Sequence, residues 1–446
     1  MMILTRQARR GTALVLVLWI TFALVVVAIY FAHSAKLGYQ ASDNSLAGFR
    51  ADQAIAGSQR YLAYMLQNVA TAGVMPSVDD GDYNAEAVEI GAAKFWILGR
   101  DENATSEPTE PTFGLVDEAS KLNLNTATLE MLEALPNMTP EVAAAIVDWR
   151  DTDSEQEPHG AESQDYLLLD NPYLAKDSDF ETVEELRFVK GVDVRLLYGE
   201  DTNRNGILDP NEDDGDESWP DDDSDGKLDP GLVEYLTTFT REPNTRADGS
   251  ARINIQTPGT GQSLIQMLID SVGADRAAQI AQVILPQRAT IDSPLAFYLA
   301  SGMTEAEFAL VEDGLTAKSG DFAVGLVNVN TAPAAVLGCL PGMTEDLADS
   351  LIQSRTGLDA EAKKSITWIT KVLPPETAKL VGPFVTTKSY QYSADVTAFG
   401  QSDRGFRRTL LVLDREDKTS LIFRRDMTRF GNPMANWDGW RTAAAN

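Results

Sequence analysis

The stretch "RRGTALVLVLWITFALVVVAIY" covers residues 9–30 and decides how the rest of the chain is interpreted. Residues 12–32 carry no charged side chain. A helix of this length, at about 1.5 Å rise per residue, spans roughly one 30 Å hydrocarbon layer. Basic flanks remain in the cytoplasm, so Arg6, Arg9 and Arg10 predict a cytoplasmic N-terminus with the bulk of the chain across the membrane. The apolar residues of this membrane helix include Leu14, Leu16, Trp19 and Phe22.

Two fates are open for this apolar segment. "FAHSA" at 31–35 has the small-x-small pattern of a signal-peptide cleavage site. A cut after Gly11 would instead leave the helix on the mature protein, starting at Thr12. The helical pattern also continues past residue 36, because small and apolar residues recur at steps of three and four and the first proline is Pro76. We therefore expect one long helix over 12–70, apolar first and amphipathic later.

The basic leader, the glycine junction and the retained helix resemble the type IV pilin-like proteins called pseudopilins. The resemblance implies a leader at 1–11, cleavage by prepilin peptidase between Gly11 and Thr12, and bundling of the helix with its neighbours. Pilins usually carry Glu at the fifth mature position, where this chain has Leu16. The minor pseudopilin K of type II secretion is similar in lacking that carboxylate, so the resemblance points to a filament end rather than the repetitive shaft.

The remaining sequence predicts an α+β fold in which a small antiparallel sheet is interrupted by helices. Strand patterns occur at 93–100 and, separated by turn signals, at 389–400, 406–416 and 419–430. The expected organisation is a pilin-like β region at 71–120 and 384–430, an inserted α-domain at 121–383 and a tail at 431–446. The K family is similar in carrying a large α-domain inserted in its pilin-like fold.

An internal repeat lies within the predicted insertion. "NLNTATLEMLEALPNMTPEVAAAIVDWR" (123–150) matches "NVNTAPAAVLGCLPGMTEDLADSLIQSR" (328–355) at a constant offset of 205. We expect Asn-Thr to cap a first helix and Thr139 or Thr344 to cap a second, and the two pairs to pack into one core. A fainter echo covers 253–284. The pattern is that of helix-hairpin-helix or SAM-like repeats.

These hairpins also resemble those of membrane-anchored competence receptors, which gives an alternative function in DNA uptake. Phosphate binding draws its affinity from clustered Lys and Arg. Residues 328–355 carry three acidic side chains against Arg355 alone, and the chain has a net charge of −30. Charge therefore disfavours nucleic acid as a partner.

The stretch "DTNRNGILDPNE" (201–212) fits the calcium-loop template. Oxygen ligands are expected from alternate positions because the loop must wrap one hard cation, and Gly206 provides the sharp turn. The predicted ligands are Asp201, Asn203, Asn205, the Ile207 carbonyl, Asp209 and the bidentate Glu212. The other interpretation is a solvated acidic linker.

A second, defective copy is present at 221–232, so that the calcium segment extends over 201–234. Its candidate ligands are Asp221, Asp223, Asp225, the Lys227 carbonyl and Asp229. Leu232 replaces the closing Glu, and Glu234 could substitute if the backbone bends. We expect one structural Ca²⁺ in the first loop and leave the second loop open.

No enzyme is expected, since no phosphate loop, nucleophile elbow or zinc spacing occurs. The resemblance to protein K implies a minor pseudopilin at the tip of the pseudopilus, in the bacterial inner membrane with the bulk of the chain in the periplasm. It also implies helix contacts with I-, J- and H-type minor pseudopilins, processing by prepilin peptidase, and contacts of the insertion with secreted proteins or the outer-membrane secretin.

Overall fold

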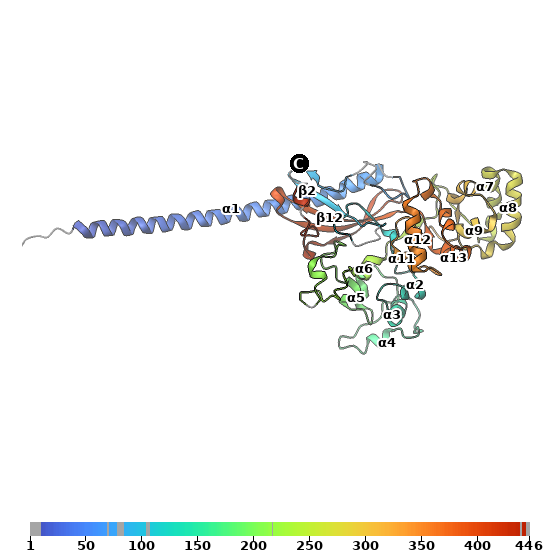
Figure 1. The fold of residues 1–446 in the computed structure, drawn as a ribbon, viewed down its shortest axis with the longest axis horizontal. Helices are drawn as coiled ribbons and strands as arrows, with labels where there is room; N and C mark the ends of the chain where they lie inside the picture. Colours follow the sequence, from blue (N-terminus) through green and yellow to red (C-terminus); the bar gives the residue numbers. More distant parts are fainter. Residues whose placement is uncertain are drawn as a thin grey trace, which may run out of the picture.

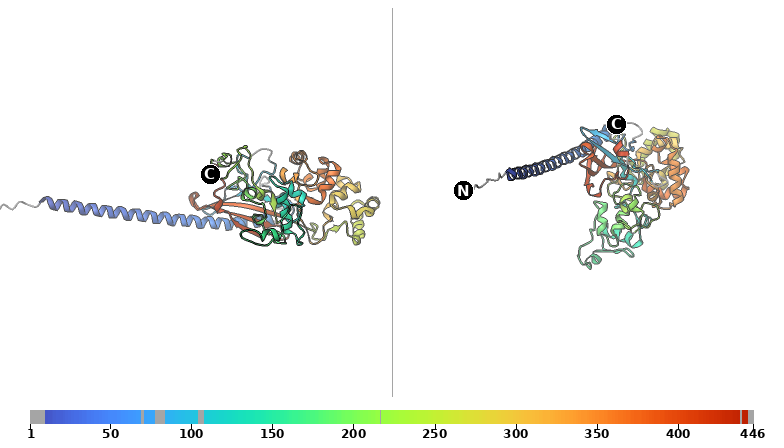
Figure 2. Two further views of the ribbon diagram at one scale, coloured as in Figure 1. Left: turned by 90° about the horizontal axis from the view of Figure 1, so that it is seen from below. Right: turned by 60° about the vertical axis from the view of Figure 1, so that its left-hand side comes forward.

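The computed structural model describes residues 10–68, 71–77, 84–103, 108–215, 217–437 and 439–442. A single rod, helix α1 (Arg10–Asn68), projects from a body that contains every other described element (Figures 1 and 2). This helix agrees with the one expected over 12–70. Residues 1–9 of the predicted leader lie outside the described residues, and Gly11 and Thr12 lie in the first turn of α1.

The two halves of α1 lie in different surroundings. Residues 13–46 are all exposed, and the most apolar window of the helix has no residue buried against the body. From Ala47 onward one face is buried, and Ala51, Ala54 and Leu62 contact the sheet. This division matches the sequence, because small and apolar residues at helical spacing begin where the helix reaches the body.

The sheet that α1 covers is antiparallel throughout. Its strands run in the order β1-β2-β12-β13-β14, and β3 pairs with β12 beside β2. The bounds are β1 Val88–Ile90, β2 Ala93–Leu98, β3 Val116–Asp117, β12 Gln391–Phe399, β13 Arg407–Asp414 and β14 Ser420–Asp426. β12, β13 and β14 form the predicted meander, and β2 joins it from the far side of the insertion. The predicted α+β class, with a long helix on a small antiparallel sheet, is confirmed.

The insertion contains three units, each bounded by a pair of short parallel strands. These pairs are β4 (Leu122–Asn123) with β5 (Leu236–Thr237), β7 (Ile253–Asn254) with β8 (Leu315–Thr316), and β10 (Val327–Asn328) with β11 (Val385–Thr386). The same backbone bond closes each unit, since the N–H groups of Leu124, Ile255 and Val329 donate to the carbonyls of Thr237, Thr316 and Thr386 at 2.8, 2.9 and 3.0 Å. The faint echo at 253–284 is therefore the start of a complete unit.

Short helices fill each unit. The first contains α2 Leu129–Glu133, α3 Pro140–Arg150, α4 Ser163–Tyr166, α5 Val194–Tyr198 and α6 Leu232–Tyr235. The second contains α7 Gly261–Val272, α8 Ala274–Gln287, α9 Pro294–Ser301 and α10 Glu305–Ala309, and the third α11 Ala334–Gly338, α12 Glu345–Thr356 and α13 Pro375–Val381. β6 (Arg241–Pro243) pairs with β9 (Phe322–Val324), and α14 spans Gly439–Thr442. α7 and α8 lie at the end of the body opposite the free end of α1 (Figure 1).

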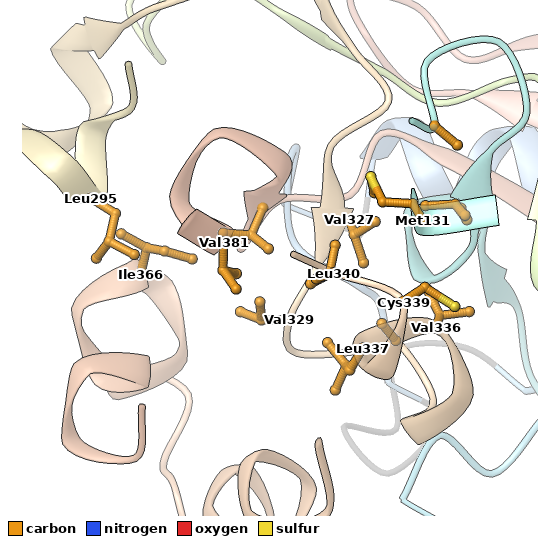
Figure 3. Packing of buried hydrophobic residues seen from close by; sticks show 14 of the residues in the cluster. Met131, Leu295, Val327, Val329, Val336, Leu337, Cys339, Leu340, Ile366 and Val381 are labelled. Atoms are coloured by element: carbon orange, nitrogen blue, oxygen red, sulfur yellow. The ribbon is translucent and has the colours of Figure 1, made fainter. Parts of the chain in front are cut away.

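The three units share one hydrophobic core. Met131 of the first unit, Leu295 of the second and Val329 of the third belong to the same buried cluster. Figure 3 shows side chains of all three units converging in this region. Because the helices are short, each unit completes the burial of its apolar side chains by packing against its neighbours.

The predicted caps are only partly correct. Thr139 and Thr344 cap α3 and α12 as expected, accepting from the N–H groups of Val142 and Leu347. The Asn-Thr pairs do not cap the first helices, and that expectation was wrong. Thr128 caps α2, and Pro333 occupies the equivalent position before α11. The Asn side chains bind distant backbone instead.

Those distant contacts link the repeat to the segment that follows it. Asn125 exchanges two hydrogen bonds with the backbone of Phe180, at 2.9 and 2.8 Å. Asn330 donates to the carbonyl of Lys363 at 2.9 Å. Each Asn therefore fastens the second half of its unit to the first, a long-range contact that local spacing does not reveal.

The matching arginines at the ends of the repeats hold the same pair of carbonyls. Arg150 donates to the carbonyls of Leu124 and Ala127, and Arg355 to those of Val329 and Ala332. Arg355 is fully buried, also donates to the Glu102 carbonyl, and has its pKa lowered to about 10 by burial.

We predict that Arg355→Met lowers the free energy of unfolding by about 3 kcal/mol, because it leaves several buried carbonyl groups without a donor. Lys371→Met removes an exposed ion pair with Glu305 and should cost less than about 0.5 kcal/mol. Thermal unfolding of the two variants measures the difference. Equal shifts would contradict a structural role for Arg355.

Candidate metal centre

The predicted calcium loop follows helix α5 and begins at a tight backbone crossing. Gly199 has φ +62°, and a Cβ at this position would lie 2.0 Å from the carbonyl oxygen of Asp229. Only glycine permits this approach. The crossing places the start of the 201–212 loop beside the end of the second acidic segment.

Asp201 organises the turn of the loop. Its Oδ1 accepts from the N–H of Asn205 at 3.0 Å and its Oδ2 from the N–H of Gly206 at 2.8 Å. Gly206 has φ +73°, the left-handed conformation for which the template requires glycine. The turn therefore has the geometry that the sequence pattern predicts.

Five predicted ligand side chains meet in this loop: Asp201, Asn203, Asn205, Asp209 and Glu212. The amide nitrogens of Asn203 and Asn205 both donate to Oδ2 of Asp209, at 2.5 and 3.2 Å. Glu212 accepts from the N–H and hydroxyl of Thr202 at 2.8 and 2.7 Å, and from the N–H of Asp209 at 3.1 Å. Ile207 lies between Asn205 and Asp209 in the sequence, and its N–H donates to Oδ1 of Asn205 at 2.7 Å.

The residues present fit a hard cation. Oδ1 of Asn203 is buried and accepts no hydrogen bond within the described ranges. Burial raises the pKa of Glu212 to about 7 and also raises the pKa of Asp201, although the nearby Arg100 guanidinium acts in the opposite direction on Asp201. All of these donor atoms are oxygens, which favours a hard cation over transition metals. The number of oxygen ligands, without a substrate phosphate, favours Ca²⁺ over Mg²⁺.

The second acidic segment is arranged differently. The N–H of Gly226 donates to Asp213 at 3.1 Å, so Asp213 takes the place that the template gives to Asp221. Asp223 and Asp225 make local turn contacts, accepting from the N–H groups of Asp225 and Lys227.

The far end of this segment turns towards other partners. Asp229 accepts from the side chain of Asn137 at 2.7 Å and from the N–H of Gly231 at 3.1 Å. Glu234 forms an ion pair with Arg100, with 2.6 Å between Nε and Oε1, and does not close the second loop as considered. Calcium binding at 221–232 stays a prediction.

Side chains of the sheet hold the backbone of the first loop. The fully buried Arg408 of β13 donates to the carbonyls of Asn203 and Arg204 and forms an ion pair with Asp395 of β12. Arg100, which follows β2, also donates to the carbonyl of Arg204. The loop thus links the insertion to the sheet.

The C-terminal tail supports the same loop. The amide of Asn436 donates to Asp209 at 2.9 Å, and that of Asn205 donates to the carbonyl of Pro433 at 3.1 Å. Sequence reasoning missed these contacts and the arginines, because the partners lie between 104 and 228 residues apart along the chain. The sequence did offer one signal for the contacts of Arg408, because an arginine in the otherwise apolar strand "RRTLLVLD" needs polar partners.

The other predicted functional residues lie on α1. Leu14, Leu16, Trp19 and Phe22 are 61 to 72% exposed, and α1 is long and apolar enough to cross a membrane by length and composition. Cys339 is buried and its pKa is raised to about 12 by burial, which agrees with a role in packing.

These features define a pilin-like fold: a long helix with an exposed apolar half, a small antiparallel sheet, and a helical domain inserted between two of its strands. Comparison with known proteins narrows the class. Residues 115–198 match the family model described as Type II secretion system (T2SS), protein K. The predicted resemblance of the chain to protein K is confirmed.

Two curated relatives carry the name Type II secretion system protein K. The chain is 26% identical to the one from Klebsiella pneumoniae over 202 residues, 42% of this chain and 60% of that protein. It is 23% identical to the one from Pectobacterium carotovorum subsp. carotovorum over 205 residues, 43% of this chain and 61% of that protein. The chain thus spans about three fifths of the length of these relatives.

Among solved structures, the chain is similar to the GspK-GspI-GspJ complex of the enterotoxigenic Escherichia coli type 2 secretion system. The match covers 90% of this chain and 98% of that chain, with 12% identity and a TM-score of 0.39.

We predict that Asp201→Ala abolishes calcium binding at the first loop, because Asp201 both closes the turn and supplies charge. Calorimetric titration of the full chain in detergent should show one site fewer than the unmodified protein. Glu130→Ala removes an exposed acid on α2 and should leave binding unchanged. A chain that produces no binding heat at all would favour the solvated-linker interpretation.

Proposed function

We propose that this protein is a minor pseudopilin at the tip of a type II secretion pseudopilus, where it promotes pseudopilus assembly and protein export across the outer membrane. The observation that carries this proposal is the division of α1. Its amphipathic half packs on the sheet, whereas its apolar half projects from the body and buries no residue against the described part of the chain. Apolar surface of that extent requires lipid or other helices.

The residue at position 16 bears on where in the filament this chain belongs. A carboxylate at the fifth mature position could neutralise the terminal ammonium of a neighbouring helix in a low-dielectric bundle. Leu16 offers no such charge. A subunit of this kind suits a filament end, where it needs helix neighbours on fewer sides than a shaft subunit.

The orientation follows from the basic residues before the helix. Arg9 and Arg10 would hold the N-terminus in the cytoplasm, so that α1 crosses the inner membrane once and the body lies in the periplasm. Prepilin peptidase would cut between Gly11 and Thr12. The α1 helix would then bundle with I-, J- and H-type minor pseudopilins, and the insertion would face secreted proteins or the secretin.

Calcium has a structural role in this proposal. Bound in the 201–212 loop, the ion would neutralise buried carboxylates and fix the backbone that Arg408 holds. Asp201, Asn203, Asn205, Asp209 and Glu212 would supply side-chain oxygens and Ile207 a carbonyl. The insertion would thereby keep a constant position on the sheet.

Complementation in the native host tests the proposal. Deleting this gene should abolish export of type II substrates, and the unmodified gene should restore it. We predict that Gly11→Val yields an unprocessed chain that does not restore export, because a branched side chain then replaces the glycine at the proposed cleavage junction. Gly38→Val lies on the exposed surface of the same helix, where a Cβ meets nothing within 4 Å, and should restore export.

Normal export by the Gly11→Val chain would contradict the proposal. DNA uptake is examined separately by gel shift of the full chain with duplex DNA at low salt. The acidic hairpins lead us to expect no shift. Clear duplex binding would favour the alternative, a DNA-uptake protein.

A further inference from the structure

A second group of carboxylates lies at the far end of the first unit, away from the 201–212 loop. Asp151, Asp153 and Glu162 each offer one oxygen, and these oxygens all lie within 4.8 Å of one another. Asp151 follows the last residue of α3 and Glu162 precedes the first residue of α4. The group therefore joins the two ends of the connection between these helices.

Several buried oxygens in this group have no partner. Glu162 is only 7% exposed, and its Oε1 accepts no hydrogen bond from the described part of the chain, although its carboxylate also caps α4. Oδ1 of Asp151 is likewise buried and without a donor. Burying a carboxylate oxygen without a hydrogen bond costs free energy. These two oxygens therefore favour a cation as their partner.

Asp148, one turn earlier on α3, adds a further orphan. It is fully buried, and its Oδ1 accepts from the N–H of Glu157 at 2.9 Å, while its Oδ2 has no donor among the described residues. The connection passes so close that a Cβ on Gly160 would lie 2.0 Å from that Oδ2. The backbone of the connection therefore approaches the Asp148 carboxylate at two places, Glu157 and Gly160.

The nearby cationic side chains bind other partners. Arg150 turns back to the carbonyls of Leu124 and Ala127. Lys176 and Lys190 pair with Glu185 and Asp165 respectively. Within the described ranges none of the four carboxylates forms an ion pair with Lys, Arg or His.

The electrostatic setting is unfavourable without a cation. The carboxylates adjoin the C-terminus of α3, the negative end of the helix dipole. Burial, followed by neighbouring carboxylates, raises the pKa of Asp151, and burial is also the main cause of the raised pKa of Glu162 and Asp148. A bound cation would offset both the unfavourable helix dipole and the burial of the negative charges.

We propose that Asp151, Asp153 and Glu162, supported by Asp148, form a divalent-cation site that takes Ca²⁺. Its donors are all carboxylate oxygens on a connecting loop, with neither sulfur nor imidazole among them, which selects a hard cation. The ion ties the start of the 151–162 connection to its end. The ring of Trp149, packed edge-to-face on Tyr166 with centroids 5.1 Å apart, lies on the same turn.

The site is separate from the 201–212 loop, because the two sets of ligands share no residue. The bound ion fixes the position of α4 and of the connection that leads to η3 (Val183–Phe188), and thereby the shape of this part of the first unit. Loss of the ion should therefore loosen residues 151–177 and leave the sheet unaffected.

Calcium titration of the full chain in detergent tests the proposal, in an Asp201→Ala background that removes the first loop. We expect Glu162→Gln, which keeps the shape and removes the charge, to weaken the remaining site about tenfold or more. Asp170→Asn changes an exposed acid nearby and should leave the affinity unchanged. Identical stoichiometry and affinity for Glu162→Gln and its background would overturn the proposal.

Two further measurements complete the test: one checks that the variant is folded, and the other locates the ion. Circular dichroism checks that Glu162→Gln is folded. If it is not, Asp153→Asn replaces it, because the side chain of Asp153 is exposed, and the same loss is expected. Luminescence of Tb³⁺, a calcium substitute, should be excited through Trp149 and fall in Trp149→Phe, whereas an unchanged signal would overturn the assignment of the ion to this place.

Discussion

The structure depends on one constraint: α1 has to satisfy two environments along a single helix. Its second half stabilises the sheet, because Ala51, Ala54 and Leu62 lie in the same buried cluster as Phe95 and Val396. Its first half packs against no such surface among the residues that the structure describes. The free-energy cost of exposing that apolar surface to water scales with its area. This half of α1 is therefore stable only when lipid or other helices cover it.

Polar contacts at several places position the insertion on the sheet, and two of them are made by fully buried side chains. At one, the buried Asp117 of β3 accepts from Asn328, Thr331 and Ser389 at 2.9, 2.7 and 2.5 Å. At the other, Arg408 holds the backbone of the acidic loop. Directional bonds of this kind fix the orientation of the insertion on the sheet more strictly than apolar contact alone.

Much of this could be predicted from the sequence where the signal is local. The apolar run, the alternation of β12 to β14 and the caps at Thr139 and Thr344 follow from neighbouring residues. The turn at Gly206 was predicted for the same reason. The bonds of Asn125 and Asn330, the carbonyl contacts of Arg408 and the orphaned Glu162 were missed, because each depends on a partner brought near only by folding. "DTDSEQEPHGAES" looks like an ordinary polar loop until the buried Asp148 and Glu162 are seen together.

The most direct test of the central claim is the N-terminal sequence of the mature protein, together with its cellular fraction. If α1 survives maturation to meet other helices, the protein extracted from the inner membrane should begin at Thr12 and carry the whole of α1. A soluble periplasmic chain that begins beyond residue 35 would contradict the account, because the exposed apolar half would then have been discarded as an export signal.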